Sequence, residues 1–212
     1  MDKALSRIIF NKNNLRTPKY FLISKDYKIN INKKIKKKGI KYPIVIKPVS
    51  EGSSLGVYIC KNKFELKKNY GKLIKEYDRI LVEQYIPGQE IQVAVMGNKA
   101  LGAIELIPKR KFYDYKAKYS SKAGTKHIIP ASISHKKYKE VLFLAKKAHK
   151  ILGCRGITRS DFRFFNNKFY LLETNTQPGM TKLSLVPEIA KYKGISFEDL
   201  VVWMVKNANY NK

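Results

Sequence analysis

The stretch Phe169-Tyr-Leu-Leu-Glu173-Thr-Asn175-Thr-Gln-Pro-Gly179 decides how this chain is organised. An apolar run ends in a carboxylate and an amide two residues apart, and a Pro-Gly turn follows. Residues two apart on a strand share a face, so Glu173 and Asn175 are predicted to aim their oxygen atoms at the same place. Such oxygen ligands suit a hard cation such as Mg²⁺. A hairpin with a polar tip explains the same pattern, so other parts of the sequence must separate the two interpretations.

The strand that precedes this stretch is predicted to form a hairpin with it. A two-residue turn at 166–167 would place Asp161 and Glu173 on opposite faces, whereas a three-residue loop at 166–168 would pair them directly. We predict the three-residue loop, because only that register builds a site, with Arg159 and Asn175 on the same face. Such a cluster is unfavourable unless a cation or an anionic substrate completes it. Mg²⁺ bridging the phosphates of a nucleotide would do so.

Composition restricts the class of protein. The chain has 212 residues, enough for two small subdomains, and no apolar run approaches the roughly 20 residues that span a bilayer. Its start shows no signal-peptide pattern, and Cys60 and Cys154 lack metal-ligand spacing, as expected for the reducing cytoplasm. The three histidines form no cluster in the sequence, which argues against a zinc site. We therefore expect a cytoplasmic protein without membrane insertion.

The formal net charge of +28 favours polyanionic partners such as nucleic acids, acidic membranes or nucleotides. Most of this charge comes from lysines dispersed through helix-like stretches, such as 33–38 and 61–75, and no zinc finger, ribonucleoprotein motif or arginine-rich arm is present. We interpret the charge as a solvated lysine surface rather than a specific nucleic-acid groove.

Six helices are predicted, including a lysine-rich helix that stops at Gly39 and an amphipathic helix over 64–75. Residues 2–14 form a helix whose apolar face comprises Ala4, Leu5, Ile8 and Ile9. Ser134 caps a helix that runs to Leu152, and the segments 184–192 and 197–206 close the chain. The inward face of the last helix is predicted to carry Leu200, Val201, Met204 and Val205.

A strand that ends in Lys47 precedes the small-residue loop Glu51-Gly-Ser53-Ser54-Leu-Gly56. Backbone N–H groups and hydroxyls in such a loop can cradle phosphate oxygens, although an ordinary glycine hairpin gives the same pattern. The loop has neither Walker nor Rossmann spacing. A strand over 79–86 then enters a connector where an adenine could lie against backbone groups. The aromatic, basic segment 111–120 is interpreted as a long loop that acts as a lid or as a packed surface loop.

Five motifs occur in order along the chain. They are Val45-Ile-Lys47-Pro with Glu51-Gly-Ser-Ser-Leu-Gly56, Phe112-Tyr-Asp-Tyr-Lys-Ala-Lys118-Tyr119, Arg159-Ser-Asp161, Leu172-Glu173-Thr-Asn175-Thr-Gln-Pro-Gly-Met-Thr, and Ser184-Leu185-Val-Pro. With them the chain resembles, over essentially its whole length, the D-alanine–D-alanine ligases of the ATP-grasp superfamily. The resemblance implies an α/β (α+β) fold of two mixed subdomains, 1–88 and 89–212, with ATP between them.

The resemblance also implies a role for each site residue. ATP would contact Lys3, Lys47, Glu51, Ser53, Ser54, Glu83, Gln84, Tyr85, Ile86, Glu90 and Lys118. Two Mg²⁺ ions, or Mn²⁺, would be held by Asp161, Glu173 and Asn175. Tyr119, Arg159, Gly179, Ser184 and Leu185 would bind D-alanine, and Ser53, Tyr119, Arg159, Gly179 and Ser184 would take part in catalysis. Arg159 and the backbone at Gly179 would stabilise the tetrahedral intermediate, and Tyr119 favours a dipeptide over a D-alanyl-D-lactate product.

The implied activity is ATP-dependent joining of two D-alanines through an acyl phosphate, for peptidoglycan precursor synthesis. Family members carry a further N-terminal domain before the position of Met1, and they are commonly dimers. We therefore expect a chain that binds Mg-ATP but needs that domain, supplied separately, for substantial dipeptide synthesis. A ligase for other acids and amines, and a polyanion-binding protein without catalysis, are the alternatives.

Overall fold

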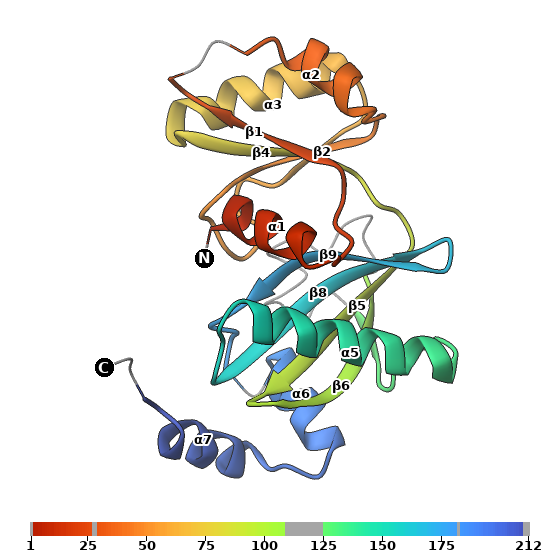
Figure 1. The fold of residues 1–212 in the computed structure, drawn as a ribbon, viewed down its shortest axis with the longest axis vertical. Helices are drawn as coiled ribbons and strands as arrows, with labels where there is room; N and C mark the ends of the chain where they lie inside the picture. Colours follow the sequence, from red (N-terminus) through yellow and green to blue (C-terminus); the bar gives the residue numbers. More distant parts are fainter. Residues whose placement is uncertain (1, 27–28, 109–124, 182, 210–212) are drawn as a thin grey trace.

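The computed structural model describes residues 2–26, 29–108, 125–181 and 183–209, and it forms two lobes joined through helix α1 and one connector (Figure 1). The smaller lobe contains a four-stranded antiparallel sheet in the order β1-β4-β2-β3. Its strands are β1 (Tyr20–Ser24), β2 (Ile44–Pro48), β3 (Tyr58–Cys60) and β4 (Arg79–Gln84). Two helices, α2 (Ile31–Lys38) and α3 (Lys63–Glu76), cover one face of this sheet.

The larger lobe contains a five-stranded antiparallel sheet in the order β7-β6-β5-β8-β9. Its strands are β5 (Gln89–Met96), β6 (Lys99–Ile107), β7 (Lys126–Ile128), β8 (Ile157–Phe165) and β9 (Lys168–Asn175). Helix α5 (His135–Ile151) packs on the face that carries Ile91 and Val93, and α6 (Leu185–Tyr192) packs on the opposite face. The predicted α/β class is confirmed, while β7 is a strand that the sequence analysis did not predict.

Local sequence explains where several helices begin and end. Ser134 caps α5 by accepting a hydrogen bond from the Lys137 N–H, as predicted. Gly39 ends α2 in the left-handed conformation, with φ of 58°, which a glycine adopts without the strain that a Cβ would add. Among the described residues no helix is both long enough and apolar enough to cross a membrane.

Helix α1 (Lys3–Lys12) is capped by Asp2, whose side chain accepts a hydrogen bond from the Leu5 N–H, but its buried face differs from the prediction. Leu5 and Ile8 are 56% and 47% exposed, whereas the charged residues Lys3 and Arg7 are buried. The helix lies between the two lobes (Figure 1), where its polar side chains meet partners that a simple apolar stripe does not anticipate. The predicted apolar face of α1 was therefore wrong for Leu5 and Ile8, whereas Ala4 is buried as predicted.

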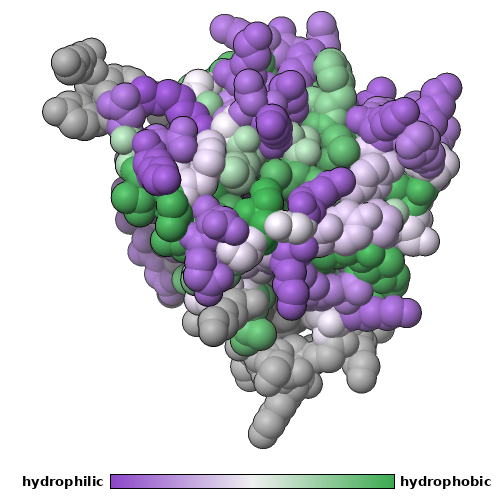
Figure 2. Space-filling view, turned by 90° about the horizontal axis from the view of Figure 1, so that it is seen from below, coloured by the Kyte–Doolittle hydropathy of each residue, from purple (hydrophilic) through white to green (hydrophobic). Residues whose placement is uncertain are grey.

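The last helix, α7 (Phe197–Lys206), also buries less than predicted. Leu200 is fully buried, but Val201 and Val205 are 37% and 71% exposed. Figure 2 shows the molecule from below, where hydrophobic residues are visible at the surface between hydrophilic ones. The predicted inward face of α7 is therefore only partly inward.

Candidate active site

A cleft between the two sheets gathers residues from both lobes. Residues predicted for the nucleotide line it from several elements: Lys3, Lys47, Glu51, Ser54, Glu83, Gln84, Tyr85, Ile86 and Glu90. Two residues predicted for the metal, Asp161 and Glu173, line the opposite side. Segments more than 100 residues apart in the sequence therefore meet at one site.

The pairing of Asp161 with Glu173 is as predicted, but the turn that was expected to produce it is not. Phe165 pairs with Lys168, so the loop contains only the two residues 166 and 167, and both have positive φ, 47° and 59°. Positive φ at both positions is typical of the type I′ turn, which matches the twist of a hairpin. The prediction of a three-residue loop was wrong.

A β-bulge at Leu172 restores the predicted register. Phe162 pairs with Leu171 and Asp161 pairs with Glu173, so Leu172 is an extra residue on β9. The burial pattern of β9 changes phase at the same place, because Leu171 and Thr174 are buried although they are three residues apart. On the other face, the buried hydroxyls of Ser160 and Thr174 are 2.9 Å apart and hold the shifted register.

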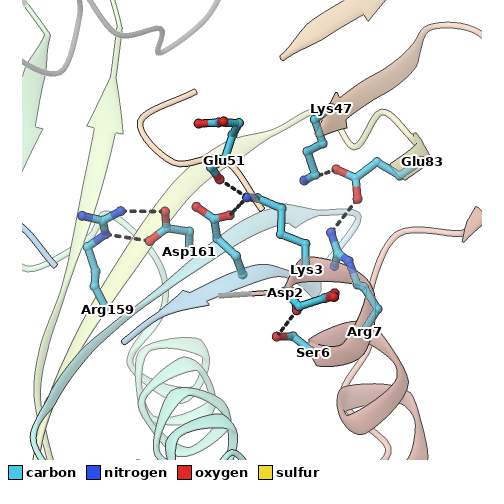
Figure 3. Close-up of polar contacts among 10 residues, drawn as sticks. Asp2, Lys3, Ser6, Arg7, Lys47, Glu51, Glu83, Arg159 and Asp161 are labelled. Carbon is cyan, nitrogen blue, oxygen red and sulfur yellow. Dashed lines mark hydrogen bonds and ion pairs between the residues drawn. The ribbon is translucent and has the colours of Figure 1, made fainter. Parts of the chain in front are cut away.

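Both carboxylates have cationic neighbours (Figure 3). Arg159 Nε and Nη2 donate to Asp161 at 2.8 and 3.0 Å, which is a bidentate ion pair. Lys3 Nζ lies 3.9 Å from Glu173 Oε2 and donates to the backbone carbonyl of Glu51. Burial lowers the pKa of Lys3, and the Glu173 carboxylate opposes that effect. The ammonium group of Lys3 thus connects the small-residue loop to the carboxylate side of the cleft.

Lys47 and Glu83 form a second charged group within the smaller lobe. Lys47 Nζ donates to Glu83 Oε1 at 2.6 Å, and Arg7 Nη2 donates to Glu83 Oε2 at 2.5 Å. Burial raises the pKa of Glu83, but the charges of Lys47 and Arg7 outweigh burial and hold it below its ordinary value. The side chain of Glu83 is therefore an anion held by two cations.

The remaining wall of the cleft is apolar with one ion pair. Val45, Val57 and Leu172 line it beside the connector, a surface on which a flat aromatic base can pack. Glu90, which was predicted to hold the ribose, accepts from Arg163 Nη2 at 3.0 Å. Arg163 also lines the cleft, and it was missed although it lies two residues after Asp161 on the same strand face.

Arg7 is the second residue that the sequence analysis missed. It is four residues after Lys3, so the two side chains lie on the same face of the helix. Two cations four residues apart on one helix indicate a charged face, and this signal competes with the apolar pattern of the same helix.

Within the described part of the chain, the residues predicted to bind D-alanine lie outside the lining of this cleft: Arg159, Gly179, Ser184 and Leu185. Gly179 and Ser184 lie together, since a Cβ built on Gly179 would be 3.0 Å from Ser184 Oγ. Ser184 Oγ also accepts from the Thr181 N–H at 3.0 Å. The Leu185 side chain is buried in the core beneath α6, so its backbone is the part available to a ligand.

Three predicted residues remain outside this description of the cleft. Lys118 and Tyr119 lie in segment 109–124, outside the described residues. Ser53 belongs to the small-residue loop and has positive φ, 51°, like Ser54 with 62°.

The oxygen atoms of Asp161, Glu173 and Asn175 are of the type that binds a hard cation. In this structure the two carboxylates form ion pairs, Asp161 with Arg159 and Glu173 with Lys3. Within the described part of the chain, no three or more acidic, histidine or cysteine side chains group as a metal site. Asp161 and Glu173 nevertheless offer carboxylate oxygens from paired positions, and Asn175 Oδ1, which accepts from the Gln177 N–H at 3.0 Å, follows on the same strand. Oxygen donors of these types fit Mg²⁺ or Mn²⁺.

The family model and the most similar curated proteins all belong to one family of ligases. The family model described as "D-ala D-ala ligase C-terminus" matches residues 9–206. The chain is 59% identical over 213 residues to a D-alanine–D-alanine ligase of Pelagibacter ubique, covering 100% of this chain and 69% of that protein. It is 45% identical over 218 residues to the ligase of Wolbachia pipientis wMel, covering 100% of this chain and 66% of that protein.

Solved structures show the same similarity. The ligase of Bacillus anthracis superposes with a TM-score of 0.85 at 30% identity, covering 97% of this chain and 66% of that one. A crystal structure of the B. anthracis ligase complexed with ATP has a TM-score of 0.83 at 25% identity, covering 97% and 65%. The chain thus spans about two thirds of the length of these relatives.

Proposed function

Because the chain belongs to the D-alanine–D-alanine ligase family, whose C-terminal model it matches over residues 9–206, we propose that it performs the ATP-dependent part of D-alanyl-D-alanine synthesis. The observation that carries this proposal is the cleft in which Lys3 and Lys47 come together with Asp161 and Glu173. Cations on one side attract the phosphates of ATP, and carboxylates on the other suit a metal ion bound to those phosphates. Residues 1–88 and 89–212 are the proposed subdomains on either side of the nucleotide.

ATP is proposed to lie with its adenine against Val45, Val57 and Leu172, and with its base edge along the backbone of 83–86. Its ribose would reach Glu90, and its phosphates would meet Lys3, Lys47 and the N–H and hydroxyl groups of Ser53 and Ser54. This orientation is supported by the positions of the apolar and cationic side chains at the cleft. Lys118, beyond the described residues, is the proposed additional phosphate contact.

The metal ion would be held by Asp161, Glu173 and Asn175. When bound, it supplies positive charge that offsets the charge developing on the phosphates during transfer. Lys3 supports the same task from the chain itself, because its buried ammonium lies beside Glu173 and the small-residue loop.

The proposed reaction has two steps. A carboxylate oxygen of the first D-alanine attacks the γ-phosphorus, so the bond to the β-phosphate oxygen breaks and ADP leaves. The amine of the second D-alanine then attacks the acyl carbon, the tetrahedral oxyanion collapses, inorganic phosphate leaves and the amine loses a proton. Arg159 and the Gly179 N–H are proposed to stabilise the oxyanion, and Tyr119, Ser184 and the Leu185 backbone to hold D-alanine.

Nucleotide binding and dipeptide synthesis are best measured separately, since the chain spans about two thirds of the relatives' length. Calorimetric titration with ATP, with and without Mg²⁺, tests the site, and we expect tighter binding with the metal. Phosphate release with D-alanine, D-lactate and other amino acids then tests the reaction and its specificity. DNA binding that depends on salt and is unaffected by ATP, together with no ATP binding, would overturn the proposal in favour of a polyanion-binding protein.

A further inference from the structure

Arg7 is a charged side chain that the proposed reaction does not use. Its side chain is 1% exposed, and Arg7 is absent from the lining of the nucleotide cleft. It donates to Glu83 on β4, at 2.5 Å, and to the backbone carbonyl of Leu171 on β9. One arginine on α1 thus reaches the sheets of both lobes, as Figure 3 shows for its contact with Glu83.

The charges around Glu83 do not cancel when Arg7 is included. The Glu83 carboxylate carries one negative charge, while Arg7 and Lys47 each carry one positive charge at its two oxygens. The three side chains together therefore have a net charge of +1. Without Arg7, Lys47 and Glu83 would form a neutral pair, and the field of the ammonium at the cleft would be largely compensated by the carboxylate 2.6 Å away.

We propose that Arg7 is a positioning residue for the nucleotide phosphates: it balances the charge of Glu83 and so leaves the positive charge of Lys47 available to them. Lys47 and Glu83 line the cleft, but Arg7 does not, so Arg7 acts through Glu83 rather than by contact with ATP. The inference rests on the proposed ATP site and adds a residue and a mechanism to it.

Burial makes this charge balance effective. The side chains of Arg7, Glu83 and Lys47 are 1%, 3% and 8% exposed, so water screens their charges weakly. The pKa of Glu83 is held below its ordinary value because the charges of Lys47 and Arg7 outweigh the effect of burial, which keeps the carboxylate ionised. The Glu83 carboxylate therefore remains a negative charge at neutral pH.

The contact of Arg7 with Leu171 adds a geometric link. Leu171 is the last regularly paired residue before the bulge at Leu172, which precedes Glu173. The same guanidinium thus connects β4, which carries the partner of Lys47, with β9, which carries a proposed metal ligand. A purely structural arginine would explain this link, so the test has to detect charge rather than folding alone.

Variants of Arg7 and Glu83 provide that test. We compare ATP with adenosine in calorimetric titrations, because adenosine has the base and ribose but no phosphates. Arg7→Met should weaken ATP binding by about tenfold or more, the effect of losing one nearby charge in a poorly screened site, and leave adenosine binding unchanged. Arg7→Lys keeps the charge and should stay within about threefold of the wild type.

The double variant Arg7→Met/Glu83→Gln has the same net charge of +1 as the wild type, since only Lys47 remains charged. Its ratio of ATP affinity to adenosine affinity should return to that of the wild type, because this ratio reports the charge felt by the phosphates, while a change in the adenine contacts near Glu83 affects both ligands alike. If Arg7→Met does not fold, the double variant still decides the question: a loss of affinity for ATP but not for adenosine in that variant would overturn the charge-balance role, because its net charge equals that of the wild type.

The outcomes separate this inference from the proposed function. Failure of the wild type to bind ATP would contradict the proposed function itself. ATP binding by the wild type, together with a double variant as weak as Arg7→Met, would overturn the charge-balance role alone. Equal losses for ATP and adenosine in Arg7→Met would likewise show that Arg7 only supports the fold.

Discussion

Glu173 lies opposite Asp161 across β8 and β9, and the extra residue Leu172 is what places it there. With a two-residue turn and no bulge, Asp161 would face Leu172, and Glu173 would point to the other side of the sheet. A bulge adds one residue to one strand, so it moves every later side chain of that strand to the opposite face. Here it places Glu173 on the face that lines the cleft, with Asn175 two residues further on the same face, while Leu171 stays in the core.

The carboxylate pair should affect both metal dependence and stability. Asp161→Asn and Glu173→Gln are each expected to abolish most of the gain in ATP affinity that Mg²⁺ produces, because an amide is a weaker ligand than a carboxylate. Asp161→Asn also leaves Arg159 without its bidentate partner, and we expect the free energy of unfolding to fall by about 1–3 kcal/mol.

Two measurements check this prediction: ATP titration with and without Mg²⁺, and urea unfolding. Asp78→Asn is the matched control, because Asp78 is 84% exposed and its pair with Lys25 spans 3.9 Å. That change should leave both the metal dependence and the free energy of unfolding within about 0.5 kcal/mol of the wild type. An unchanged Mg²⁺ effect in Glu173→Gln would remove Glu173 from the metal site.

The hairpin turn predicts opposite effects for two substitutions at one position. Asn167 has φ of 59°, where a β-branched side chain is strained and glycine is not. Asn167→Val should lower the free energy of unfolding by about 1–2 kcal/mol, whereas Asn167→Gly should leave it equal or slightly higher. Urea unfolding of the two variants provides the measurement, and a more stable valine variant would contradict the type I′ turn.

Gly88 lies in the connector between the lobes and leaves no room for a side chain. Its φ is 93°, and a Cβ there would lie 2.2 Å from the carbonyl oxygen of Phe164. Gly88→Ala should therefore displace the connector, lower the free energy of unfolding by about 2 kcal/mol or more and weaken ATP binding.

Gly71→Ala is the control for that substitution. Gly71 lies within α3, and a Cβ there meets no heavy atom within 4 Å. Alanine restricts the unfolded chain and favours the helix, so this variant should gain about 0.5–1 kcal/mol in the free energy of unfolding. Thermal and urea unfolding of both variants test the contrast, which fails if the two substitutions have the same sign.

His149 predicts a pH dependence of stability. It lies in the last turn of α5, is 3% exposed, and its Nδ1 lies 2.8 Å from the hydroxyl oxygen of Thr158. Burial lowers the pKa of His149 below its ordinary value of 6.5, so the unfolded chain binds a proton more readily than the folded one. Its contribution is fully present above pH 6.5 and is lost as pH falls from there through the lower folded pKa.

Urea unfolding between pH 5 and 8 measures this effect. The wild type should lose up to about 1.4 kcal/mol per pH unit from this group in the acidic part of the range. His149→Gln should remove that part of the slope, whereas His135→Gln, at an exposed position at the start of α5, should retain it. Identical slopes in the wild type and His149→Gln would contradict the prediction.

Local sequence was sufficient to predict most of the helices and strands, and the pairing of Asp161 with Glu173. Ser134 and Gly39 marked the start of α5 and the end of α2, because capping depends on residues that are neighbours in the chain. The spacing of Glu173 and Asn175, and the requirement that Asp161 join them, predicted which residues face one another. These features depend on residues that are close together in the chain, so a sequence pattern can predict them.

Only the tertiary structure decided how that pairing is made and which polar groups support it. The sequence pattern did not distinguish a third loop residue from a bulge, because both shift the register by one, and the shift is held by the distant pair Ser160 and Thr174. Helix α1 was misjudged because the partners of Arg7 lie 76 and 164 residues away. A buried charge is stable only where partners meet it in space, and the amphipathic pattern of a single helix carries no information about those partners.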